Sequence, residues 1–150
     1  MNTPLSHILS QKGTSVTTVA PTATVSEAVR VMNELHIGAV LVTGTDRKLL
    51  GIFTERDVLS RIVGPGADPK TTSVQAVMTT KLVTATHVTT VDEAMALFMD
   101  RRIRHLPVLD NGVIAGIISI GDINRRMLEE NLQEAKHLRH YIHGDVSSAV

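Results

Sequence analysis

The chain has 150 residues, 43% of them hydrophobic, and its 15 basic side chains balance its 15 acidic ones. This composition is typical of a folded protein, and the balanced charge argues against binding to nucleic acid or an anionic membrane. The absence of cysteine excludes disulfides, thiolate catalysis and cysteine zinc sites. With no signal-peptide pattern and no apolar run of about 18 residues, we expect a cytoplasmic protein without a membrane partner.

The first half of the chain predicts five elements in the order strand, helix, strand, strand and helix. Thr24 and Glu27 form a capping box, in which each side chain satisfies a backbone donor of the first helical turn. Apolar residues then recur at helical spacing. The expected elements are a strand at 16–20, a helix from 24, strands at 39–43 and 49–54, and a helix from 55.

The second half predicts the same order after a turn-rich linker at 64–69 and a short helix at 73–78. Thr90 and Glu93 repeat the capping box, and 110–112 is a strong hairpin signal. The last helix is predicted to end near Gly144, a common type of helix terminator. The expected elements are strands at 82–86, 106–109 and 113–120, with helices from 90 and from 122.

The two halves match each other directly in sequence. Residues 24–28 match 90–94 at an offset of 66, and 51–57 match 116–122 at an offset of 65. The single deletion lies in the turn between the paired strands, where a length change is tolerated. We therefore predict an α/β (α+β) fold of two βαββα repeats, 1–70 and 71–150, packed sheet to sheet about a pseudo-twofold axis, with an extra C-terminal helix.

One polar motif occurs in both copies at the start of the second helix. It is Thr54-x-x-Asp57 in the first copy and Ser119-x-x-Asp122 in the second. Either motif could be only a helix cap. The same residues could instead bind a nucleotide, with the carboxylate accepting hydrogen bonds from the ribose hydroxyls.

The whole layout resembles a tandem pair of cystathionine β-synthase (CBS) domains, also called a Bateman module, of the stand-alone bacterial type. The segments that carry the resemblance are 25–28, 37–42, 51–57, 77–79, 102–108 and 116–122. The resemblance implies two clefts that bind adenosine compounds: AMP, ADP, ATP, NAD(H) or S-adenosylmethionine. By analogy, one cleft contains Thr17, Ile37, Gly38, Ala39, Ser119 and Asp122. The other contains Thr84, Ile103, Arg104, His105, Thr54 and Asp57.

The two expected clefts are unequal. Gly38 permits close approach of a ligand to the backbone, whereas its counterpart Arg104 brings bulk and charge. We therefore expect the Asp122 cleft to bind better, with Arg104 and His105 close to phosphates. Lys12 is either a surface lysine or a phosphate contact.

Two functions remain open from the sequence, and a third, an enzyme, is weighed against them. The first is a regulatory adenosine-binding module, a homodimer that acts on an unknown regulated protein or through self-association. The second is a structural or dimerisation module without a physiological ligand. An enzyme is not expected, because His105 with Asp57 or Asp122 lacks a nearby nucleophile or a metal-binding carboxylate cluster.

His137, His140 and His143 lack further ligands, so no metal site is predicted. The apolar residues of the last helix are expected to pack on the module or on a partner.

Overall fold

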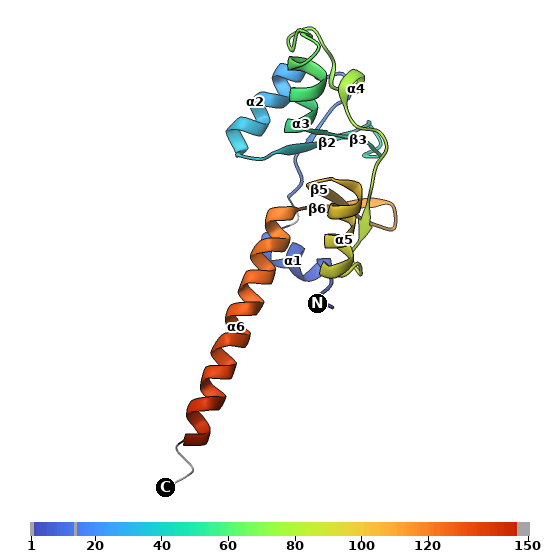
Figure 1. Cartoon of the computed structure of the whole chain (residues 1–150). Helices are drawn as coiled ribbons and strands as arrows, with labels where there is room; N and C mark the ends of the chain where they lie inside the picture. The colour runs from blue at the N-terminus through green and yellow to red at the C-terminus, as the bar shows by residue number, and fades with distance from the viewer. Residues whose placement is uncertain (1, 14, 147–150) are drawn as a thin grey trace.

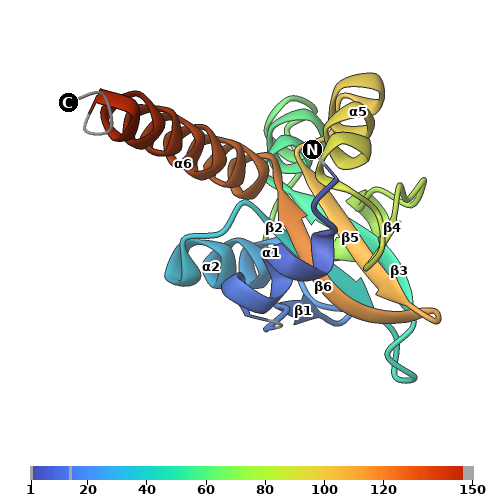
Figure 2. The ribbon, with the colours of Figure 1, turned by 90° about the horizontal axis from the view of Figure 1, so that it is seen from below.

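Two similar halves stack on one another in the computed structural model, which describes residues 2–13 and 15–146 (Figure 1). Each half holds a three-stranded sheet, in the orders β1-β2-β3 and β4-β5-β6. A long C-terminal helix leaves the second half and extends away from it (Figures 1 and 2). The predicted pair of α/β repeats is thereby confirmed. Among the described residues, no helix is both long and apolar enough to cross a membrane.

The first repeat follows the predicted order, with a capping box at Thr24 and Glu27 that opens its first helix. Its second helix departs from α-geometry after one turn and continues as a π-helix. The elements are β1 (Thr18–Val19), α2 (Val25–Leu35), β2 (Ala39–Thr43), β3 (Leu49–Thr54), α3 (Glu55–Asp57) and η1 (Val58–Val63).

The second repeat has the same order, with the capping box at Thr90 and Glu93. The last helix runs through Gly144 to residue 146, so the predicted end near Gly144 was slightly early. The elements are α4 (Val74–Val77), β4 (Ala85–Thr86), α5 (Val91–Arg101), β5 (His105–Asp110), β6 (Val113–Ser119) and α6 (Ile120–Val146).

The two sheets share one register pattern. In each sheet the short first strand pairs parallel to the second, and the second pairs antiparallel to the third. The register shifts between Val42 and Thr43 and at the equivalent step between Val108 and Leu109. Apolar residues of both sheets form one cluster between the repeats. Its members are Ala39, Leu41 and Ile52, with Val16, Leu49, Leu82, Ile114 and Ile117 packed against them.

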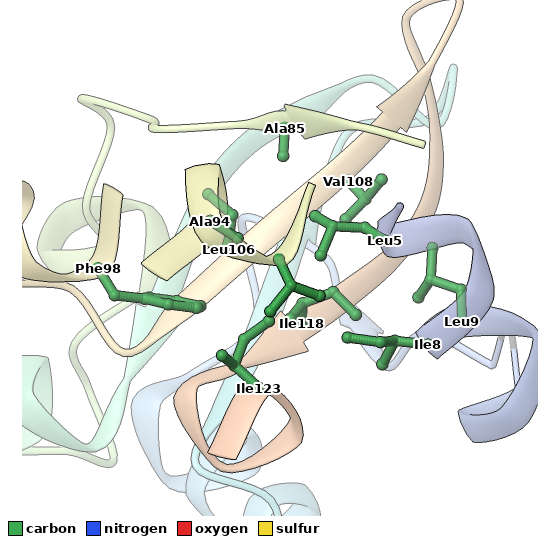
Figure 3. Packing of buried hydrophobic residues seen from close by; sticks show 11 residues of the cluster. Leu5, Ile8, Leu9, Ala85, Ala94, Phe98, Leu106, Val108, Ile118 and Ile123 are labelled. Carbon is green, nitrogen blue, oxygen red and sulfur yellow. The ribbon is translucent and has the colours of Figure 1, made fainter. Parts of the chain in front are cut away.

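A helix that the sequence did not predict, α1 (Leu5–Lys12), completes the core of the second repeat. Leu5, Ile8 and Leu9 lie against the side chains of the second sheet and its helices (Figure 3). Leu5 N–H donates to Thr89 O, and Val91 N–H donates to Thr3 O. The N-terminal segment that the sequence grouped with residues 1–70 therefore packs on the second repeat.

The short helix α4 occupies the equivalent place on the first repeat. Val74 N–H donates to Ala23 O, and Val25 N–H donates to Thr72 O, which reproduces the bonds made by the segment before α1. Each repeat is thus completed by the segment that precedes the other repeat in the chain. This exchange ties the two repeats together and sets the residues just after α1 and α4 beside the clefts between them.

Candidate functional site

A cavity of about 350 Å³ lies between the repeats on the side of Asp57. Apolar and basic side chains share its wall with the Thr54-x-x-Asp57 motif, and its volume lies within the range of small-molecule sites. We call it the Asp57 cleft. It is lined by Gly38, Ile52, Thr54, Glu55, Arg56, Asp57, Leu59, Thr79, Arg102, Ile103, Arg104 and His105.

A smaller cavity of about 240 Å³ lies beside the Ser119-x-x-Asp122 motif. We call it the Asp122 cleft. Asp122 is not one of its lining residues, contrary to the sequence-based expectation. It lines a separate cavity together with Lys12, which lines both cavities and is hydrogen-bonded to Asp122. The lining residues are Lys12, Ser15, Thr17, His36, Ile37, Gly38, Ala39, His105, Ile117 and Ser119.

Gly38 and His105 form the wall that the two clefts share, because both residues line both cavities. They lie so close that a Cβ atom on Gly38 would be 3.3 Å from the His105 ring and 3.3 Å from the Glu55 carboxyl carbon. Glu55 N–H donates to Gly38 O, just as Ile120 N–H donates to Arg104 O at the equivalent position. A side chain at Gly38 would therefore press on the boundary between the clefts.

Asp57 is buried, and residues of the same chain donate hydrogen bonds to its carboxylate. Its Oδ2 accepts from Thr54 N–H at 3.0 Å and from the Thr54 hydroxyl at 3.3 Å. Its Oδ1 accepts from the Thr79 hydroxyl at 3.1 Å and lies 3.8 Å from Arg61 Nε. The Asp57 carboxylate therefore caps the helix start and also fixes the segment after α4 against the cleft.

Asp122 is bonded differently, because a lysine replaces the threonine. Lys12 Nζ donates to Asp122 Oδ2 at 2.7 Å and to Ile117 O at 2.9 Å, and Ser119 N–H donates to the same carboxylate oxygen at 2.8 Å. Burial on its own raises the pKa of Asp122, but the bonds from Lys12 and Ser119 outweigh it and hold the pKa below its ordinary value. Asp122 is therefore ionised and already paired with a cation.

His105 carries little positive charge at neutral pH. Burial lowers its pKa, and the positive charges of Lys12 and Arg104 act in the same direction, against the opposing effects of Glu55 and Asp122. A neutral imidazole can donate or accept one hydrogen bond but is not a fixed cation for phosphate. The cationic character of the Asp57 cleft comes instead from Arg56, Arg102 and Arg104.

Most of the residues that the resemblance singled out are brought together, in the two groups expected. Arg102, Ile52, Leu59 and Thr79 also line the Asp57 cleft, although sequence reasoning did not select them. Ile52, Thr79 and Arg102 lie in the matched segments 51–57, 77–79 and 102–108, so the family motifs could have found them, whereas Leu59 lies outside these segments. Thr84 is exposed just before β4 and is not among the lining residues of the Asp57 cleft. Within residues 2–13 and 15–146, no group of three or more His, Asp or Glu side chains is arranged to hold a metal ion.

Comparison with known proteins identifies both halves. The family model for the CBS domain matches residues 5–64 and 74–129. The mitochondrial CBS domain-containing protein CBSX3 of Arabidopsis thaliana is 42% identical over 125 residues, which are 81% of this chain and 61% of that protein. The chain therefore spans less than two thirds of the length of this relative.

Solved structures show the same fold. A CBS-domain-containing protein from Agrobacterium tumefaciens is 42% identical, with a TM-score of 0.80 over 83% of this chain and 99% of that one. A CBS-domain pair in complex with 5-methylthioadenosine and S-adenosyl-L-methionine has a TM-score of 0.76 and 21% identity, over 87% of this chain and 99% of that one. The latter similarity concerns the fold alone.

Proposed function

This chain belongs to the CBS-domain family, and we propose that it is a regulatory module that binds an adenosine compound between its repeats and catalyses no reaction. The Asp57 cleft carries the proposal, because it combines an apolar wall with three arginines and a carboxylate. Ile52, Leu59 and Ile103 offer apolar surface to a purine ring. Arg102 and Arg104 offer bidentate donors to phosphate oxygens.

The charge distribution supports a further proposal, that the two clefts prefer different ligands. Three arginines, one glutamate and one aspartate line the Asp57 cleft, and this excess of one positive charge favours an adenosine compound with several phosphates, such as ADP, ATP or NAD(H). The Asp122 cleft is smaller, and its lysine is already bonded to Asp122. It suits a less charged adenosine compound, such as AMP or one of the kind bound in the crystallised CBS pair of the same fold. This order of preference reverses our expectation from the sequence.

The output of such a module acts on a second protein or on its own oligomeric state. A ligand in either cleft contacts residues of both repeats, because residues of both repeats line each cleft. Ligand binding can therefore change how the repeats sit against one another, provided that the ligand binds the two arrangements with different affinity.

A thermal-shift panel tests the proposal. The ligands are AMP, ADP, ATP, NAD+, NADH and S-adenosylmethionine, with inorganic tripolyphosphate as an anion control. A ligand at 100 times its Kd stabilises the folded state by about 2.7 kcal/mol. We expect ATP to raise the Tm of the wild type by more than tripolyphosphate does. Arg104→Ala should remove most of the ATP effect, while Arg30→Ala, an exposed arginine on α2, should leave it unchanged.

The alternative function is a structural module with empty clefts. One observation favours it: each carboxylate accepts from the backbone N–H at its helix start, as a helix cap would, and from a side chain, Thr79 for Asp57 and Lys12 for Asp122. The same panel separates the two functions, because a structural module shows no Tm shift with any adenosine compound beyond that of tripolyphosphate.

A further inference from the structure

The charge of the Asp122 cleft comes from one side chain. Among the described residues that line this cleft, Lys12 is the only lysine or arginine, and none is an aspartate or a glutamate. Asp122 lines the adjoining cavity instead, together with Lys12. A ligand in the Asp122 cleft therefore meets the lysine and not the carboxylate of the motif.

Two hydrogen bonds hold the Lys12 ammonium group at the wall of the cleft. Nζ donates to Asp122 Oδ2 at 2.7 Å and to the backbone oxygen of Ile117, another lining residue, at 2.9 Å. An ammonium group has three donors, so one donor of Lys12 has no acceptor within residues 2–13 and 15–146. The Lys12 side chain is 36% exposed, which leaves this third donor accessible to a ligand.

Thr79 holds the equivalent place beside the Asp57 cleft. Thr79 N–H donates to Ile52 O at 2.8 Å, and its hydroxyl donates to Asp57 Oδ1 at 3.1 Å. Lys12 makes the corresponding pair of contacts in the second repeat, to a backbone oxygen and a carboxylate. The two lead-in segments therefore bring a neutral hydroxyl to one cleft and a compact positive charge to the other, and a lysine ammonium is a common ligand of phosphate.

The Asp122 carboxylate is occupied by donors of its own chain. Its Oδ2 accepts from Lys12 and from Ser119 N–H, and its side chain is 15% exposed. A carboxylate bonded in this way fixes the direction of the ammonium group. Lys12, and not Asp122, is therefore the part of the pair that is open to a ligand.

We propose that Lys12 determines the specificity of the Asp122 cleft, where it selects a nucleoside monophosphate over the uncharged nucleoside, and that Asp122 is a positioning residue for Lys12. The third donor of Lys12 bonds to a phosphate oxygen, while Asp122 keeps its bond to Lys12 and does not bind the ribose. A single cation in the smaller cleft suits one phosphate better than several. This inference rests on the proposed function and names the ligand class of one cleft.

Methyl-detected NMR titrations distinguish the two clefts. Ile37 and Ile117 line the Asp122 cleft and not the Asp57 cleft, whereas Ile52 and Ile103 line only the Asp57 cleft of the two. The ligands are AMP and adenosine, which differ only in the phosphate. In the wild type we expect both ligands to shift the Ile37 and Ile117 methyl signals, with AMP binding about 10-fold or more tightly than adenosine.

Lys12→Thr gives the second repeat the residue type that the first has at Thr79. It should weaken AMP binding at the Ile37 and Ile117 signals by about 10-fold or more and leave adenosine binding within about twofold. Lys70→Thr, with the same charge change in the exposed linker, should leave the binding of both ligands unchanged. Equal weakening of AMP and adenosine by Lys12→Thr would show a structural lysine and overturn the proposal, and so would unchanged AMP binding.

Asp122→Asn separates a positioning residue from a ribose ligand. Asparagine still offers an oxygen to Ser119 N–H but lacks the charge that orients Lys12. AMP binding should weaken by about threefold or more, adenosine binding should stay unchanged, and the same substitution in Lys12→Thr should have no further effect. Because adenosine carries the same ribose, weaker adenosine binding in Asp122→Asn would show a ribose ligand and overturn the proposal. If neither ligand shifts any of the four isoleucine methyl signals, the proposed function itself fails, and this inference fails with it.

Discussion

Lys12 and Asp122, which lie 110 residues apart in the sequence, are joined by a hydrogen-bonded ion pair of 2.7 Å. The bond joins the end of α1 to the start of α6, beside the smaller cleft. In the first repeat the equivalent carboxylate accepts from the neutral hydroxyl of Thr79 and has its cation, Arg61, farther away at 3.8 Å. The two carboxylates therefore differ in how closely a cation approaches them, although their motifs are nearly identical.

Removing the lysine should raise the pKa of Asp122. In Lys12→Met, burial still disfavours the carboxylate, while the charge and the bond that offset burial are gone. The pKa of Asp122, followed by NMR of its carboxyl carbon during an acid titration, should move upward from its wild-type value. Lys70→Met, in the exposed linker, should leave it in place. An unchanged pKa in Lys12→Met would mean that the ion pair does not form in solution.

The loss of Asp57 should cost more stability than the loss of Asp122. Asp57→Ala leaves part-buried donors on Thr54 and Thr79 without this acceptor, which costs about 1–3 kcal/mol of unfolding free energy. Asp122→Ala removes a partly exposed pair with Lys12 and one backbone bond, for about 1 kcal/mol or less. Urea denaturation of the two variants measures the difference. The reverse order would show that Asp57 is not the structural cap described above.

His105 should make the protein less stable as the pH falls below about 6.5. Because its pKa is lowered in the folded state, the unfolded chain binds protons first as the pH decreases. Its contribution is therefore complete above the unfolded pKa and is lost as the pH falls through the folded pKa. Denaturation of the wild type and of His105→Gln between pH 5 and 7.5 should show a shallower pH dependence in the variant. Parallel curves would contradict the buried, neutral state of His105.

The glycines of the third strands should tolerate alanine unequally. A Cβ at Gly51 would lie 2.6 Å from Met78 Sδ and 2.9 Å from the Thr79 backbone oxygen. A Cβ at Gly116 would lie 2.5 Å from Leu9 Cδ2, the end of a flexible side chain. Gly51→Ala should therefore destabilise by about 1–3 kcal/mol and Gly116→Ala by less, measured by thermal denaturation. Equal losses of stability in the two variants would mean that Met78 and Thr79 move away from the new methyl group as easily as Leu9 does.

The repeat architecture was predictable because its signals are local and occur twice. The capping boxes at Thr24 and Thr90, the hairpin turns and the internal matches all depend on residues close together in the sequence. The first strand of each sheet was predicted too long, because only two residues of each pair with a neighbouring strand. The exchange of lead-in helices was not predictable, since α1 has no side-chain cap and is defined by packing on residues about 80 or more positions away.

The sequence predicted which residues line the two clefts better than it predicted which cleft is larger. The family motif placed Thr54, Ile103 and Arg104 around one cleft and Thr17, Ile37 and Ser119 around the other, and the structure groups them so. Binding by these residues remains a prediction, as does a cytoplasmic location. Lys12, Thr79 and Arg102 also line the clefts, and their positions there follow from tertiary packing. The expected advantage of the Asp122 cleft rested on the contrast between Gly38 and Arg104, but Gly38 lines both clefts.

The most direct measurement of the central claim is a calorimetric titration of ATP into the wild-type protein, with 2′-deoxy-ATP and tripolyphosphate titrated in parallel. We expect saturable ATP binding that Arg104→Ala weakens. Loss of the ribose hydroxyl that bonds to a carboxylate should weaken 2′-deoxy-ATP by about 10-fold or more, and tripolyphosphate should bind more weakly still. Binding of tripolyphosphate as tight as that of ATP, or no saturable heat with ATP, would contradict an adenosine site between the repeats.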